Sequence, residues 1–146
     1  MSDLTQGRPA KRVQYAALPY RRGSDSQVEV LLITSRDTRR WVIPKGWPKT
    51  GKAPHLSAAH EAFEEAGVAG IIDEIAIGSY LYDKRLEQGE TVACEVHVFA
   101  LEVTQEHEAW PEQAERDVVW VAPNDAAEMV YEPLLRELLR GFTSML

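Results

Sequence analysis

The chain has 146 residues, the size of one compact domain, and 45% of them are apolar, which is enough for a hydrophobic core. Its formal net charge of -7 argues against non-specific binding to nucleic acid or to an anionic membrane, because both need a broad positive field. The single cysteine, Cys94, excludes a disulfide within the chain, and no apolar run approaches the roughly 20 residues that a membrane helix needs. We therefore expect a cytoplasmic protein.

The pattern along the chain predicts a single α/β domain over residues 11–146, preceded by a flexible, polar N-terminus at residues 1–10. Alternating or continuous apolar runs predict strands at 13–20, 28–34, 41–43, 91–103 and 118–121, with another inside 71–82. Helical periodicity predicts helices at 55–66, 124–130 and 133–142. Glycine and proline predict a loop at 45–54, and acidic residues fill a second loop at 105–115.

The helix expected at 55–66 carries an unusual concentration of negative charge. On a helical wheel, one side is apolar and is expected to pack on a sheet; it consists of Leu56, Ala59, Phe63 and Ala66. The largely opposite side carries Glu61, Glu64 and Glu65. Carboxylates one turn apart repel each other, whereas a hard cation such as Mg²⁺ prefers carboxylate oxygens. The acidic side is therefore either a metal site or a solvated helix face.

The context of this helix favours the metal site. The residues from Gly46 to Val68 read GWPKTGKAPHLSAAHEAFEEAGV. This segment resembles the Nudix box, in which a Gly, five residues, a Glu and seven further residues precede Arg-Glu-apolar-x-Glu-Glu-x-Gly-apolar. Gly46 matches the first position, and the stretch from Glu61 to Val68 matches the last part with its spacing intact. The resemblance, which extends over most of the chain, implies an α/β/α sandwich with a mixed sheet between helices.

Two positions depart from the box. Lys52 stands where the family has Glu, and His60 stands where it has Arg. In the family these two residues pair and brace the loop against the helix. A lysine and a histidine cannot restore that ion pair, so we expect the loop to be braced by other contacts.

The resemblance implies a hydrolase that uses divalent metal ions to cut a diphosphate linkage. It assigns catalytic roles to Glu61, Glu64 and Glu65, and the same three side chains with the carbonyl of Gly46 would hold Mg²⁺, with Mn²⁺ as an alternative. The number of ions stays open. The general base also stays open, and the candidates are Glu64 and the acidic-loop residues Glu106, Glu108, Glu112 and Glu115.

Within the family, the spacing is most similar to the diphosphoinositol polyphosphate and diadenosine polyphosphate hydrolase branch. A cradle for a small-molecule polyphosphate is expected from Arg12, Arg36, Arg40, Lys45, Lys49, Lys84 and Arg85. Against an inositol substrate, Glu132 precedes Pro133 where that branch has Lys, while Trp47 could stack on a base. The alternatives are another nucleoside diphosphate derivative as substrate, or a non-catalytic sensor that binds a nucleotide.

Overall fold

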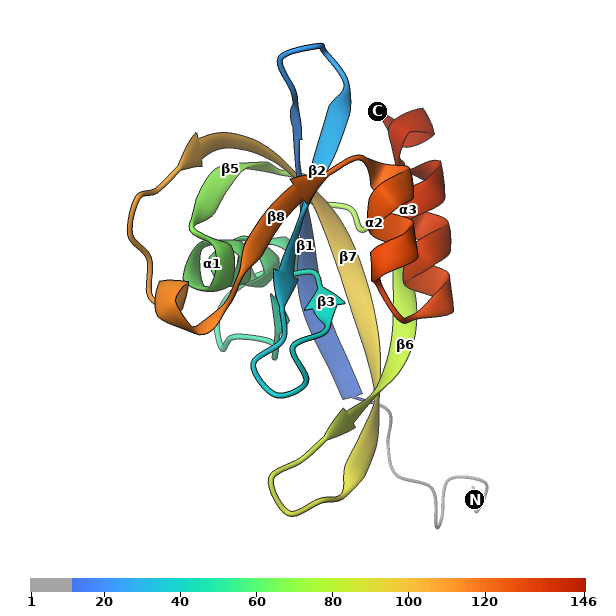
Figure 1. The fold of residues 1–146 in the computed structure, drawn as a ribbon. Helices are drawn as coiled ribbons and strands as arrows, with labels where there is room; N and C mark the ends of the chain where they lie inside the picture. The colour runs from blue at the N-terminus through green and yellow to red at the C-terminus, as the bar shows by residue number, and fades with distance from the viewer. Residues whose placement is uncertain (1–11) are drawn as a thin grey trace.

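The computed structural model describes residues 12–146, in which one mixed sheet is flanked by helices on both faces (Figure 1). The strands are β1 (Arg12–Arg22), β2 (Val28–Thr34), β3 (Trp41–Val42), β4 (Lys45–Gly46), β5 (Val68–Ile72), β6 (Gly78–Arg85), β7 (Thr91–Glu106) and β8 (Val118–Val121). The helices are α1 (Pro54–Ala66), α2 (Pro123–Met129) and α3 (Pro133–Met145). As Figure 1 shows, α1 lies on one side of the sheet, and α2 and α3 lie on the other.

The strand β1 organises the sheet. The sheet order is β3-β2-β1-β7-β5, while β4 pairs with β1, β6 with β7, and β8 with β2. The β1–β7 pairing is parallel, with Tyr15 opposite His97, and the other pairings between these strands are antiparallel. Because β1 also pairs with β4 through Tyr15 and Gly46, the sheet brings the loop that follows β4 next to its centre.

Residues of opposite strand faces form two separate hydrophobic cores, because successive side chains of a strand point to opposite sides. In β2, Val30 and Leu32 join the core under α2 and α3, whereas Leu31 and Ile33 join the core under α1. All four are fully buried, which explains why β2 reads as a continuous apolar run.

The two cores differ in the side chains that the helices contribute. Against one face, α3 packs the large, fully buried residues Leu135, Leu139 and Phe142, and α2 adds Ala126 and Ala127. Against the other face, α1 contributes the small residues Ala58, Ala62 and Ala66.

The structure confirms the α/β/α sandwich with a mixed sheet. Two details of the sequence prediction were wrong. Lys45 and Gly46 form the short strand β4 inside the expected loop, since two residues are too few to produce a periodic signal. The strand β5 was missed because it begins directly after the helix C-cap Gly67 and contains a bulge between Ala69 and Gly70. The N-terminal segment 1–10 lies outside the described residues.

Candidate active site

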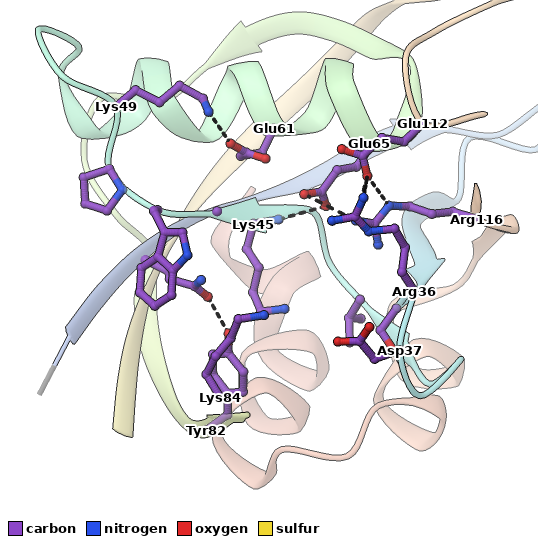
Figure 2. A pocket seen from close by; sticks show the side chains of 16 residues that line it. Arg36, Asp37, Lys45, Lys49, Glu61, Glu65, Tyr82, Lys84, Glu112 and Arg116 are labelled. Carbon is purple, nitrogen blue, oxygen red and sulfur yellow. Dashed lines mark hydrogen bonds and ion pairs between the residues drawn. The ribbon is translucent and has the colours of Figure 1, made fainter. Parts of the chain in front are cut away.

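A cleft of about 370 Å³ opens between α1, the loop after β4 and the strand β6 (Figure 2). Its walls are rich in charge of both signs. The acidic lining residues are Asp37, Glu61, Glu65 and Glu112. The basic lining residues are Arg36, Lys45, Lys49, Lys84 and Arg116. The cleft therefore combines carboxylates that could hold a cation with cationic groups that could hold phosphate.

The helical-wheel prediction for α1 holds for Ala66, which is buried in the core, but not for Glu61, Glu65 and Leu56. Glu61 and Glu65 are only 8% and 6% exposed and share the buried side of the helix with Ala58 and Ala62, whereas Leu56 is 46% exposed. The helical wheel predicted the packing side of α1 mainly from its largest apolar side chains. In the folded chain, the alanines let the helix approach the sheet closely, and the two carboxyl groups at the edge of that contact face the cleft.

The carboxyl group of Glu65 lies in a confined, largely protein-lined environment. The backbone N–H of Lys45 donates to its Oε1 at 3.3 Å, and Arg116 Nη2 lies 3.7 Å from its Oε2. Burial raises the pKa of Glu65 to about 8, hydrogen bonding with Glu61 acts in the same direction, and Arg116 opposes it. Without a metal, burial therefore favours the protonated form of Glu65.

Glu61 lies against the chain at the start of the loop. A Cβ at Gly46 would come within 2.5 Å of the Glu61 carboxyl carbon, so a larger residue there would displace this carboxyl group. Lys49 Nζ lies 2.8 Å from Glu61 Oε2 (Figure 2). The backbone N–H of Lys49 also donates to Ser57 Oγ at 3.2 Å. Lys49 thus ties the loop to α1 by both its side chain and its backbone.

These contacts supply the loop bracing that the altered box positions were expected to lack. Lys52 is exposed, and its backbone N–H donates to the Lys49 carbonyl at 3.0 Å. His60 Nε2 lies 4.0 Å from Glu64 Oε2, one turn along the helix.

Glu64 differs from its two acidic neighbours. Its side chain is about one third exposed and is not among the residues that line the cleft. Its backbone carbonyl accepts a hydrogen bond of 3.0 Å from the N–H of Glu112. This bond fastens the acidic loop to α1 and places Glu112 beside the cleft.

Arg116, which the sequence analysis did not single out, holds one wall of the cleft. Its Nε donates to Glu112 Oε1 at 2.8 Å and its Nη1 donates to the Thr34 carbonyl at 3.1 Å, and its side chain is only 8% exposed. The available signal was a lone arginine at the end of an acidic segment, just before the strand β8.

Only some residues of the predicted basic cradle line the cleft. Arg36, Lys45, Lys49 and Lys84 line the cleft, whereas the other three predicted residues do not. Arg12 Cζ lies 5.9 Å from the ring of the cleft residue Trp47, and Arg85 is exposed next to Lys84 on β6. Arg40 lies in a neighbouring hollow, with its Cζ 4.8 Å from the Tyr131 ring.

The comparison with known families decides the classification. A model of the NUDIX domain matches residues 11–142. The chain belongs to the Nudix family. This confirms the resemblance inferred from the segment that begins at Gly46.

Individual Nudix proteins resemble the chain at moderate identity. It is 34% identical over 117 residues to Nudix hydrolase 12, mitochondrial, from Arabidopsis thaliana, covering 77% of this chain and 58% of that protein. It is 30% identical over 122 residues to diphosphoinositol polyphosphate phosphohydrolase 3-beta from Bos taurus, covering 80% of this chain and 70% of that protein. The chain thus spans less than two thirds of the length of some curated relatives.

Among solved structures, a C. elegans Ap4A hydrolase in a binary complex has the same fold. Its TM-score is 0.69 at 21% identity, covering 92% of this chain and 96% of that chain. Among the described residues, no helix is both long enough and apolar enough to span a membrane.

The residues of the cleft fit a metal ion that is bound partly by protein and partly by other ligands. Residues 12–146 contain no group of three or more acidic, histidine or cysteine side chains arranged around one ion. They do place the two buried carboxyl groups of Glu61 and Glu65 in contact, with the backbone of Gly46 against them. Mg²⁺ is commonly held by one or two carboxylates while keeping several waters and substrate phosphates, so this donor set suits it.

Proposed function

We propose that this Nudix protein is a metal-dependent hydrolase that cuts a phosphoanhydride in a small polyphosphorylated molecule. The observation that carries the proposal is the buried pair Glu61 and Glu65 on the floor of a cleft whose walls bear Arg36, Lys45 and Lys84. Two buried carboxyl groups in contact are costly unless a proton or a cation lies between them. In a complex with a divalent cation and a polyphosphate, the carboxyl pair would hold the cation and the basic side chains would contact the phosphates.

Within this proposal, Glu61, Glu65 and the carbonyl of Gly46 hold Mg²⁺ or Mn²⁺. The bound ion would neutralise phosphate charge and lower the pKa of a water molecule. Arg116 supports Glu65 from the opposite side, because it is fixed by Glu112 and by the Thr34 carbonyl. The chain's own contribution is therefore to hold two carboxyl groups in place inside a partly enclosed site.

The acidic loop offers one base candidate at the cleft. Glu112 lines the cleft, whereas Glu106, Glu108 and Glu115 do not. Glu106 pairs with Arg21 at 3.0 Å, Glu115 with Arg36 at 2.9 Å and Glu112 with Arg116 at 2.8 Å, so the place of Glu112 in the cleft distinguishes it and not the lack of a partner. We propose that Glu112 accepts the proton from the attacking water, with Glu64 as the alternative that the box resemblance suggests.

Basic side chains on four segments would bind the phosphates. Lys45 belongs to β4, Lys49 to the following loop and Lys84 to β6, and Arg36 approaches from the loop after β2. Burial lowers the pKa of Lys45, while Glu65 raises it, so an arriving phosphate would favour the charged ammonium. A diadenosine polyphosphate or a diphosphoinositol polyphosphate carries enough phosphates to occupy this set.

A non-catalytic nucleotide-binding role is the second candidate. The contact of 2.8 Å between Lys49 Nζ and Glu61 favours it, because a lysine already neutralises one of the proposed metal ligands. We place either activity in the cytoplasm, where the buried free thiol of Cys94 would remain reduced.

Hydrolysis of four substrate classes, followed by chromatographic separation of the products, tests the proposal. The panel contains diadenosine polyphosphates, nucleoside diphosphate sugars, nucleoside triphosphates and inositol pyrophosphates, each with Mg²⁺, with Mn²⁺ and with EDTA. Hydrolysis that needs the metal and is lost in Glu65→Gln but not in Glu128→Gln supports the enzyme, since Glu128 is an exposed residue of α2. Tight nucleotide binding without turnover in any condition would support the sensor instead.

A further inference from the structure

The acidic loop that follows β7 is fastened to the C-terminal end of α1. The N–H of His107 donates to the Gly67 carbonyl at 2.8 Å, and the N–H of Glu112 donates to the Glu64 carbonyl at 3.0 Å. The last carbonyl groups of a helix have no partner within the helix, so the loop satisfies groups that α1 leaves open. The same segment places the side chain of Glu112 at the cleft.

The side chain of Trp110 packs directly on the backbone of Gly67, the residue that ends α1. A Cβ added at Gly67 would collide with the indole ring. Trp110 Nε1 is buried and has no hydrogen-bond partner among residues 12–146, so packing holds the indole in place. Beside it, the rings of His107 and Phe63 meet edge to face, with their centroids 5.0 Å apart. Apolar and aromatic contacts therefore dominate this junction.

The charges around the junction oppose the position of the loop. Glu112 approaches the C-terminal end of α1, where the negative end of the helix dipole and the carboxyl groups of Glu64 and Glu65 already lie. Arg116 offsets part of this repulsion, because its Nη2 lies 2.8 Å from Glu112 and 3.7 Å from Glu65. Uncharged contacts must supply the rest, and Trp110 is the largest apolar side chain in the acidic loop.

Only Pro111 separates the indole from Glu112. Proline fixes its own φ and restricts the residue before it to extended backbone, so this segment has few accessible conformations. The N–H of Gln113 donates to the Trp110 carbonyl at 3.2 Å and closes a turn around Pro111 and Glu112. Because the turn is stiff, the position of the indole determines where the carboxyl group of Glu112 lies.

We propose that Trp110 is a positioning residue that holds Glu112 at the cleft by anchoring the acidic loop on Gly67. Trp110 does not line the cleft, so it acts on the reaction only through Glu112. This proposal rests on the proposed function, in which Glu112 accepts the proton from the attacking water.

Steady-state kinetics of a double-mutant cycle test the proposal. The values of kcat and KM for the substrate that wild type hydrolyses best are measured in wild type, Glu112→Gln, Trp110→Ala and the double variant. Glu112→Gln should lower kcat about 100-fold, the scale of a lost general base, and Trp110→Ala about tenfold with KM nearly unchanged. In the double variant, Trp110→Ala should have no further effect, because the residue through which it acts is already disabled. A further tenfold fall in the double variant, or an unchanged kcat in either single variant, overturns the proposal.

Two further variants separate positioning from a general loss of stability. Trp110→Phe keeps an aromatic ring on Gly67 and should restore most of the kcat that Trp110→Ala loses. Tyr20→Ala removes a half-buried ring from the opposite face of the sheet, where Tyr20 packs on Phe142 at a centroid distance of 5.3 Å. It should lower the stability and leave kcat near the wild-type value. Equal losses of kcat in Tyr20→Ala and Trp110→Ala contradict the proposal.

Amide hydrogen exchange, followed by NMR, separates this proposal from the proposed function. If wild type hydrolyses no substrate, the hydrolase proposal fails, but the anchoring of the loop can still be measured. The N–H groups of His107 and Glu112 should exchange at least about tenfold faster in Trp110→Ala than in wild type, through local opening of the loop. In Tyr20→Ala they should exchange at the wild-type rate. Equal exchange in wild type and Trp110→Ala overturns the proposal.

Discussion

Leu135, Leu139 and Phe142 of α3 close one face of the sheet with fully buried apolar side chains, whereas α1 closes the other face with alanines and two buried glutamates. The face under α2 and α3 therefore removes apolar surface from water. The face under α1 buries Glu61 and Glu65, whose carboxyl groups lose hydration and repel each other. Both faces bury apolar side chains, but only the face under α1 gives up part of the resulting stability to keep a charged site.

The largest expected effect lies on the apolar face. Phe142→Ala should destabilise the protein by about 3–5 kcal/mol, because it removes a fully buried ring that packs on Tyr20 at a centroid distance of 5.3 Å. Denaturant unfolding measures the loss. Activity per folded molecule should stay near the wild-type value, and a large fall in kcat at unchanged KM would break the proposed division between the two faces.

On the charged face, Glu65→Gln should have the opposite effect, in which activity falls and stability is kept. It should lower kcat by about 100-fold, the scale of losing an important electrostatic group, which corresponds to about 2.7 kcal/mol. Stability in EDTA should not fall, because the amide removes a costly buried carboxyl group. Steady-state kinetics at saturating Mg²⁺ measure kcat, and unfolding curves in EDTA measure the stability. Near-native turnover in this variant would show that Glu65 has no part in catalysis.

The contact between the loop and α1 should give an intermediate effect. Lys49→Met keeps the length of the side chain but removes the ammonium group that lies 2.8 Å from Glu61. KM for a polyphosphate should rise about tenfold, about 1.4 kcal/mol, because a phosphate-binding cation is lost and the loop is held less firmly. Lys52→Met, an exposed change in the same loop, is the control. An equal rise in KM for both variants would indicate only a general charge effect.

The pH dependence of stability should also distinguish the charged face from the apolar face. The pKa of Glu65 is about 8 in the folded protein, above its ordinary value of 4.5. Between these values the folded chain binds more protons than the unfolded chain, so this group lowers the free energy of unfolding as pH rises. In EDTA, wild type should therefore lose more stability from pH 5 to pH 8 than Glu65→Gln. Parallel pH profiles for the two proteins would remove the case for a strained carboxyl pair.

The fold was predictable where local pattern and final environment agree. The strands β2 and β8 lie at the predicted residues, because their apolar runs are buried or half-buried along their whole length. The orientation of α1 was not predictable from Leu56 and Phe63, because the packing surface is made by alanines whose contribution appears only when the sheet is present.

The residues of the candidate site were likewise predictable only where local spacing places them together. Spacing alone placed Glu61 and Glu65 together, since they lie one turn apart on α1. Arg116 reaches its position through long-range contacts with Glu65 and Thr34. No local motif marks this residue, so its role became visible only in the folded chain.

Binding of Mn²⁺, followed by electron paramagnetic resonance without substrate, shows whether the buried pair Glu61 and Glu65 forms a divalent metal site. We predict saturable binding to wild type and to Glu128→Gln, and at least about tenfold weaker binding to Glu65→Gln, on the scale of one lost interaction with a charged group. Equal Mn²⁺ affinity in all three folded proteins would contradict the account.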